Sequence, residues 1–170
     1  RISGPAFTVK CEPGDHLMLH AAIYRASPGD IIVVQADDKF AVAGGNVCAI
    51  AQSRGIKGFV IDGVIRDLAE TRENKFPVFA RGVVPKPGAK KCVAPLNQPI
   101  QCGGVTVNAG DIIVADEEGV AVIPQAQAAS AFEIAKARAD KDEAMSLSQW
   151  QAQHSEKVES TLASLGFEDS

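Results

Sequence analysis

Arg66, Asp67 and Glu70 are the residues of this chain whose types and spacing best suit chemistry. They follow an apolar stretch that ends at Asp62-Gly63, where a strand is expected to give way to a helix. Arginine offers a planar pair of donors to a carboxylate or an enolate oxygen. Aspartate offers the hard oxygen ligand that Mg²⁺ and Mn²⁺ prefer, and Glu70 shares its helix face. The alternative is a solvated helix start with a capping acid.

A second segment, Gly44-Gly45-Asn46-Val47, opens the next candidate helix upstream. Backbone N–H groups at a helix start have no partner within the helix, and the helix dipole favours an anion there. A substrate carboxylate would suit this position. Because a glycine pair before a helix is also a common turn, the segment alone does not establish a binding site.

His16 and His20 are four residues apart on a predicted helix, which is the spacing of a metal-binding pair. The intervening residues, 17–19, lack the glutamate of a metalloprotease motif, so we interpret both histidines as core or interface residues. His16 stands near a helix start and could still border a pocket. Lys86 and the doublet Lys90-Lys91 form a small basic patch, which we interpret as a solvated loop.

Several function classes find no support in the sequence. No nucleophile elbow, dinucleotide fingerprint or P-loop is present. Seventeen basic and 21 acidic residues give a net charge of −4 without a basic stripe, so we expect no nucleic-acid partner. No apolar run reaches the roughly 18 to 20 residues of a membrane span. The four cysteines lack paired spacing, which favours free thiols in the cytoplasm: Cys11, Cys48, Cys92 and Cys102.

The elements that must position these residues alternate between strand and helix patterns. Predicted strands cover residues 4–9, 31–34, 58–63, 78–80, 104–107, 111–115 and 120–123. Predicted helices cover residues 16–25, 46–54, 66–74 and most of 125–165, with Asp15 as the first N-cap. This order predicts an α/β fold with a mixed sheet, in which ligands gather beyond the carboxyl ends of the strands. Arg1 begins the chain as if within a strand, so we expect a missing N-terminal segment.

The spacing Gly45-x20-Arg66-Asp67-x2-Glu70 resembles the signature of class II pyruvate aldolases. These are the 4-hydroxy-4-methyl-2-oxoglutarate and 4-carboxy-4-hydroxy-2-oxoadipate aldolases, in the superfamily of the regulator of ribonuclease E activity (RraA). The resemblance runs from Arg1 to about Pro124. It includes Ser3-Gly4-Pro5-Ala6, Pro13-Gly14-Asp15, Asp62-Gly63, Pro77-Val78-Phe79-Ala80-Arg81-Gly82, Cys102-Gly103-Gly104-Val105 and Gly110-Asp111.

This resemblance implies an α/β/β/α sandwich like the swivelling phosphohistidine domain over residues 1–124, followed by a C-terminal helical extension over 125–170. It also implies a ring-shaped trimer, or a hexamer of stacked trimers, with active sites at subunit clefts. In such a ring, Asp142 or Glu143 would match an acidic residue that the C-terminal helix of a neighbour contributes.

The activity that the resemblance implies is cleavage of 4-hydroxy-4-methyl-2-oxoglutarate, or a related 4-hydroxy-2-oxo acid, to pyruvate through an enolate. Oxaloacetate decarboxylation is implied as a second activity. Asp67 matches the ligand of Mg²⁺ or Mn²⁺, and Arg66 matches the catalytic, substrate-binding arginine. Gly44, Gly45, Asn46 and Val47 match the loop that holds the pyruvyl carboxylate.

The alternative within this superfamily is a non-catalytic regulator that binds and inhibits ribonuclease E. Such a protein would use the same fold without chemistry, and it has no need of Arg66, Asp67 and Glu70 together. Because this chain has all three, we favour the enzyme.

Overall fold

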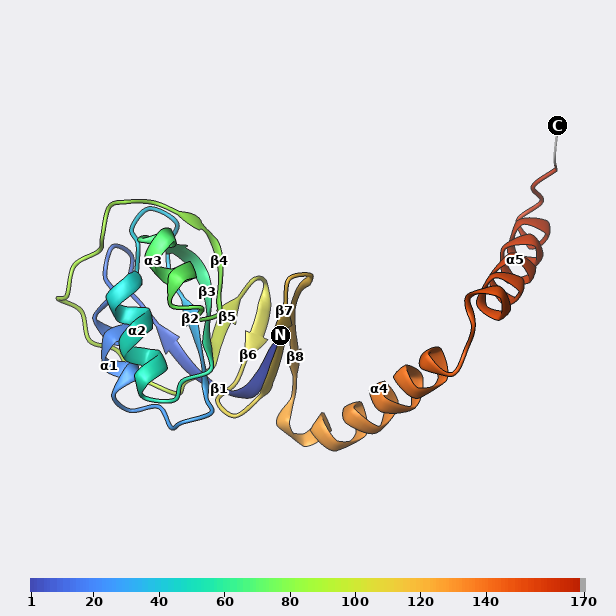
Figure 1. The fold of residues 1–170 in the computed structure, drawn as a ribbon. Helices are drawn as coiled ribbons and strands as arrows, with labels where there is room; N and C mark the ends of the chain where they lie inside the picture. Colours follow the sequence, from blue (N-terminus) through green and yellow to red (C-terminus); the bar gives the residue numbers. More distant parts are fainter. Residues whose placement is uncertain (169–170) are drawn as a thin grey trace. The chain divides into compact units, whose positions relative to one another are not determined.

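The computed structural model describes residues 1–168, which form two compact units divided after Ala128. The first unit is a mixed α/β structure, and the second is helical (Figure 1). None of the helices in the described part of the chain is long and apolar enough to cross a membrane.

Four parallel strands form most of the central sheet, in the order β4-β3-β2-β1. Their bounds are β1 Ile2–Lys10, β2 Ile31–Gln35, β3 Gly58–Ile65 and β4 Val78–Val83. The connecting helices lie on one face of this sheet (Figure 1): α1 Leu17–Ile23, α2 Gly45–Ser53 and α3 Leu68–Glu73. This is the alternating pattern that the sequence predicted.

Two antiparallel strands, β7 Ile112–Asp116 and β8 Gly119–Ile123, extend the sheet beyond β1. Strand β1 belongs to both parts, because residues 2–5 pair with β7 and residues 6–10 pair with β2. A separate hairpin consists of β5 Ile100–Cys102 and β6 Val105–Val107, joined at Gly103-Gly104. Strand β5 was not predicted.

The central strands are buried on both faces, which explains their uninterrupted apolar runs. Ile32 and Val34 of β2 face the helices, whereas Ile31 and Val33 face the β5–β6 hairpin. Helices, sheet and hairpin therefore supply three of the expected layers, α, β and β, within residues 1–128. The predicted α/β class and the helical C-terminal part are confirmed.

The predicted end of β3 is wrong. The strand passes through Asp62-Gly63 and ends at Ile65, so Arg66 is the first residue after it. Gly63 lies inside the strand, and a larger residue would not fit there, because an added Cβ would lie 2.8 Å from the backbone oxygen of Asp37. Here the glycine marks a close backbone approach and not the end of the strand.

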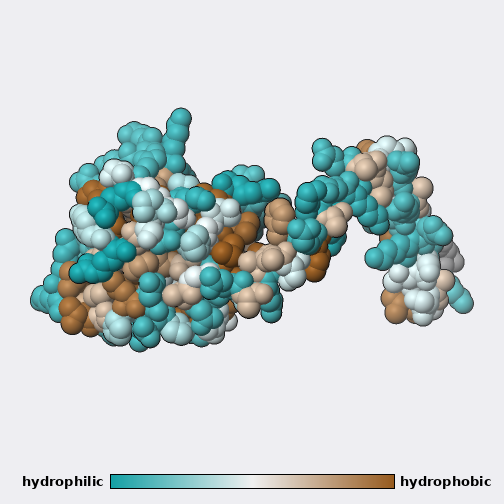
Figure 2. All heavy atoms as spheres, turned by 90° about the horizontal axis from the view of Figure 1, so that it is seen from below, coloured by the Kyte–Doolittle hydropathy of each residue, from teal (hydrophilic) through white to brown (hydrophobic). Residues whose placement is uncertain are grey.

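The C-terminal unit consists of α4, which begins at the boundary (Ala128–Glu143), and α5 (Leu147–Ser164), after a short 3₁₀ turn at Gln125–Gln127. Ser146 caps α5 by accepting a hydrogen bond from the backbone N–H of Gln149. No residue of either helix is buried. Figure 2 shows apolar residues interspersed with hydrophilic ones along this part of the chain.

Candidate active site

A pocket of about 110 Å³ lies where the end of β3 meets the starts of α1 and α2. This is the edge at which ligands bind in open α/β sheets. The residues that line it come from four segments: His16, His20, Ala41, Val42, Ala43, Gly44, Asn46, Val47, Arg66, Asp67, Pro87 and Lys90. The structure thus brings the Gly44–Val47 segment and the Arg66-Asp67 pair together.

Asp67 is held in an unusual backbone conformation directly before α3. Its φ is 55° and its ψ is 48°, in the left-handed region, which turns the chain sharply from the strand into the helix. Its side chain accepts a hydrogen bond from the backbone N–H of Gly45 at 3.3 Å and lies 3.4 Å from the Arg66 guanidinium. Its backbone oxygen accepts hydrogen bonds from the N–H and hydroxyl of Thr71. The carboxylate is therefore fixed in direction but partly open to solvent.

The two glycines at the start of α2 are required by space. Gly44 has extended backbone angles that any residue can adopt, but an added Cβ would collide with the Asp67 carboxylate. An added Cβ on Gly45 would lie 2.7 Å from the Cβ of Glu70. The glycine pair therefore lets the acidic start of α3 approach the start of α2.

The start of α2 has the properties of an anion site. Cys48 is the first residue whose N–H bonds within the helix, to the oxygen of Gly44. The N–H groups of Asn46 and Val47 have no helical partner because they belong to the first turn. Both residues line the pocket, so these donors and the helix dipole can act on a carboxylate there.

Glu70 does not line this pocket. It is exposed in the first turn of α3, where its Cβ packs against Gly45. The sequence placed Glu70 on the same helix face as Asp67; in the structure Asp67 precedes α3 in a left-handed conformation, and of the two residues only Asp67 lines the pocket. Glu70 supports the contact between α2 and α3.

His16 and His20 both line the pocket. From the sequence, a place at the border of a pocket was considered only for His16. Their rings stack with centroids 4.5 Å apart and an interplanar angle of 11°. Burial lowers the pKa of both imidazoles, that of His20 to about 4, and the Lys90 ammonium lowers both further. Both rings are therefore neutral at pH 7. Their i,i+4 spacing was a usable signal for this pair.

Lys90 is a pocket residue that the sequence assigned to a solvated loop. Its loop is held to the start of α1 by Asp15, whose carboxylate accepts hydrogen bonds from the backbone N–H groups of Leu17, Lys91 and Cys92. The backbone N–H of His16 also donates a hydrogen bond to the backbone oxygen of Ala89. Burial alone would raise the pKa of Asp15, but these hydrogen bonds outweigh it and leave the pKa below its usual value. No sequence signal links Lys90 to α1.

The donor set of the pocket fits a hard divalent cation that keeps most of its water. Among residues 1–168, no three His, Cys, Asp or Glu side chains gather as a metal cluster. Asp67 is the carboxylate that lines the pocket. Mg²⁺ characteristically binds through one or two carboxylates, with water and substrate oxygens completing its octahedron. One fixed carboxylate beside room for a substrate meets that requirement.

The acidic residues predicted to complete a neighbour's site lie in the second unit. Asp142 and Glu143 are exposed in the last turn of α4. Their assignment to a neighbouring active site stays a prediction.

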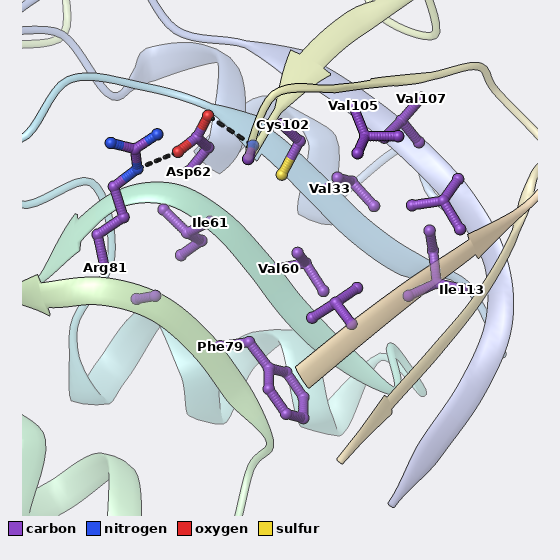
Figure 3. Close-up of a pocket in the computed structure, with 14 residues that line it drawn as sticks. Val33, Val60, Ile61, Asp62, Phe79, Arg81, Cys102, Val105, Val107 and Ile113 are labelled. Carbon is purple, nitrogen blue, oxygen red and sulfur yellow. Dashed lines mark hydrogen bonds and ion pairs between the residues drawn. The ribbon is translucent and has the colours of Figure 1, made fainter. Parts of the chain in front are cut away.

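A second pocket, of about 300 Å³, lies on the opposite face of the sheet and is mainly apolar (Figure 3). At its polar end, Asp62 accepts hydrogen bonds from the Arg81 guanidinium and from the N–H of Gly103 at 2.8 Å. Burial raises the pKa of the nearby Cys102 thiol to about 11, so this thiol is not a nucleophile at neutral pH. Asp62 thus fastens the β5–β6 hairpin to β3 and β4.

The fold and the pocket define the class: an α/β protein with a mixed sheet, whose pocket at the start of α2 is lined by Arg66, Lys90 and one carboxylate, Asp67. A family model described as RraA-like, Aldolase/RraA, matches residues 1–122. The chain belongs to this RraA-like family.

Two relatives and one solved structure illustrate the similarity. The chain is 43% identical over 146 residues to a Halalkalibacterium halodurans protein named "Putative 4-hydroxy-4-methyl-2-oxoglutarate aldolase", covering 85% of this chain and 70% of that protein. A Burkholderia multivorans protein of the same name is 35% identical over 124 residues, covering 72% and 75%. The RNA-processing inhibitor RraA from Thermus thermophilus superposes with a TM-score of 0.68 at 27% identity, covering 73% and 76%.

Proposed function

We propose that the protein is a divalent-metal-dependent class II aldolase. It cleaves 4-hydroxy-4-methyl-2-oxoglutarate or a related 4-hydroxy-2-oxo acid and releases pyruvate. The observation that carries the proposal is the meeting of Arg66, Asp67 and the start of α2 in one pocket. The names of the two relatives above support the reaction class.

The pocket supplies complementary groups to each part of such a substrate. The N–H groups of Asn46 and Val47 suit the carboxylate next to the 2-oxo group. Arg66 lies beside this position, and Lys90 adds a cation that suits the second carboxylate. Asp67 would hold Mg²⁺ or Mn²⁺, which when bound supplies Lewis acidity toward the 2-oxo group. Because Arg66 and Lys90 both line the pocket, we expect a preference for a dianionic substrate.

Cleavage requires a proton to leave the 4-hydroxyl group while the C3–C4 bond breaks. The electron pair of that bond moves onto the pyruvate fragment as an enolate, and C4 leaves as a carbonyl. Arg66 stabilises the enolate oxygen by a charge-assisted hydrogen bond that strengthens as the charge develops. Protonation at C3 then gives pyruvate. Decarboxylation of oxaloacetate reaches the same enolate, so we propose it as a second activity.

The test is a lactate-dehydrogenase-coupled pyruvate assay over a panel of 2-oxo acids. The panel includes 4-hydroxy-4-methyl-2-oxoglutarate, 4-carboxy-4-hydroxy-2-oxoadipate and oxaloacetate. We expect EDTA to abolish pyruvate release and Mg²⁺ or Mn²⁺ to restore it. Full activity of a demonstrably metal-free preparation would disprove the metal-dependent mechanism.

The second candidate function is protein-binding regulation of ribonuclease E. The structural similarity to the Thermus RNA-processing inhibitor favours it. Such a regulator would slow RNA cleavage by purified ribonuclease E in proportion to its concentration, and it would do so equally after Asp67→Ala substitution. Pyruvate release that depends on Asp67, without an effect on RNA cleavage, would assign the aldolase function.

A further inference from the structure

We propose that the stacked pair His16–His20 accepts the proton of the substrate's 4-hydroxyl group. The proposal rests on the aldolase function above and assigns its general base. The pair stands in the wall of the Arg66–Asp67 pocket, with His16 at the N-cap of α1 and His20 within that helix.

The chemistry of the lining residues leaves few other bases. Apart from the histidines, the ionisable groups that line the pocket are Arg66, Asp67 and Lys90. Arg66 and Lys90 are cations and have no lone pair to offer. Asp67 already accepts from Gly45, pairs with Arg66 and is the candidate metal ligand. A proton from a neutral hydroxyl can therefore pass within the pocket only to an imidazole of the pair or to water.

The surroundings of the pair keep it in the basic form. His16 is only 9% exposed, and its Nδ1 is buried without a hydrogen-bond partner. Burial is the largest effect against a positive charge on either ring, and Lys90 adds to it, as Arg66 does for His16. Asp15 and hydrogen bonds to the backbone of Ala41 and Val42 favour a positive charge. The balance lowers the pKa of both rings, so a lone pair is available at neutral pH.

The two rings act as one acceptor. Because they are stacked 4.5 Å apart, protonation of one disfavours protonation of the other, and a single proton titrates with the pair. In the forward step the hydroxyl O–H bond breaks, the proton moves to one imidazole nitrogen, and the C3–C4 electrons form the enolate. The same proton can return to C3 of the enolate and give pyruvate, so the pair ends the cycle neutral.

A comparison of two reactions in the same pocket distinguishes a general-base role of the histidine pair from a purely structural role. Aldol cleavage must remove a hydroxyl proton, whereas oxaloacetate reacts as a carboxylate that is already deprotonated. We would measure both reactions for His16→Asn, His20→Asn and the double variant, with the same metal. His154→Asn is the matched control, since His154 is an exposed histidine that stacks on Trp150 in α5.

We expect the double variant to lose about 10²-fold or more in kcat for aldol cleavage, as a lost general base typically does. Oxaloacetate decarboxylation should stay close to wild type, which also shows that the pocket is intact. Parallel loss of both reactions, or unchanged aldol cleavage, would overturn the assignment while leaving the aldolase function in place. A wild-type protein without aldol cleavage would overturn the proposed function itself and this assignment with it.

Discussion

Arg66 and Asp67 are adjacent in the chain, but their side chains serve different purposes in the pocket, and truncation should separate them. Asp67→Ala removes the metal ligand, so metal binding and turnover should vanish together. Arg66→Ala leaves that ligand in place and should lower kcat by about 10²- to 10³-fold, with some rise in KM. Arg66→Lys should not rescue fully, because a point charge cannot replace the planar fork.

Steady-state kinetics on oxaloacetate, combined with metal titration, measure these effects. Both variants should keep the circular dichroism of the wild type, since the two side chains are 44% and 37% exposed and do not belong to the core. Near-wild-type kcat for Arg66→Ala, or tight metal binding by Asp67→Ala, would place the active site elsewhere in the chain.

Gly44 is predicted to tolerate no side chain. In Gly44→Ala the new methyl group would meet the Asp67 carboxylate, so metal affinity and turnover should fall although Asp67 itself is unchanged. Gly82→Ala is the matched control, because a Cβ there would make only ordinary contact, 3.7 Å from Val64. Isothermal titration with Mn²⁺ compares the two variants. Equal affinity in both would show that the close approach of Gly44 to Asp67 is not needed.

The connection between α1 and the 87–92 loop depends on one carboxylate. Asp15→Ala leaves three backbone N–H groups without their acceptor, in a place where Asp15 is only 4% exposed. We expect a loss on the order of 3 kcal/mol in the free energy of unfolding, and a higher KM because Lys90 is no longer held. Asp30→Ala, which removes an exposed hydrogen bond to Ser27, is the control and should cost less. Urea denaturation measures both.

The same carboxylate predicts a pH dependence. The folded-state pKa of Asp15 lies below its usual value of 3.8, so its contribution to stability is complete above that pH. The contribution is lost as the pH falls through the folded-state pKa. The stability difference between wild type and Asp15→Ala should therefore shrink in acid. A difference that stayed constant down to the acid unfolding transition would mean that the interaction does not depend on the charge.

At the scale of the molecule, the C-terminal helices predict association. Helices α4 and α5 have 16 and 18 residues and bury none of them, whereas isolated helices of such length are marginal in water. Leu147, Trp150 and Leu165 are at least half exposed, as expected of residues that pack on another subunit. We predict a ring trimer or a hexamer. Sedimentation showing an active monomer at micromolar concentration would contradict this prediction.

Local patterns in the sequence were sufficient for the main elements, and together with the family resemblance they singled out Arg66, Asp67 and the Gly44–Val47 segment. The uninterrupted apolar run 31–34 predicted a buried strand, and β2 covers it as Ile31–Gln35. The glycine pair and Arg66-Asp67 were recognisable because their chemistry depends on residue type and short spacing. Such features can be read from the sequence without the structure.

Only the tertiary structure decided which distant groups share the pocket and which nearby ones do not. Lys90 reaches it because Asp15 binds the backbone of Lys91, 76 residues away, and no local spacing encodes that contact. Glu70, three residues from Asp67, does not line the pocket and packs against Gly45 instead. Asp62 faces the opposite side of the sheet, since β3 continues past it and alternate residues of a strand point to opposite faces. The direction of a side chain and the contacts between residues far apart in the sequence depend on the whole folded chain. Residue types and the periodicity of apolar residues can be read locally.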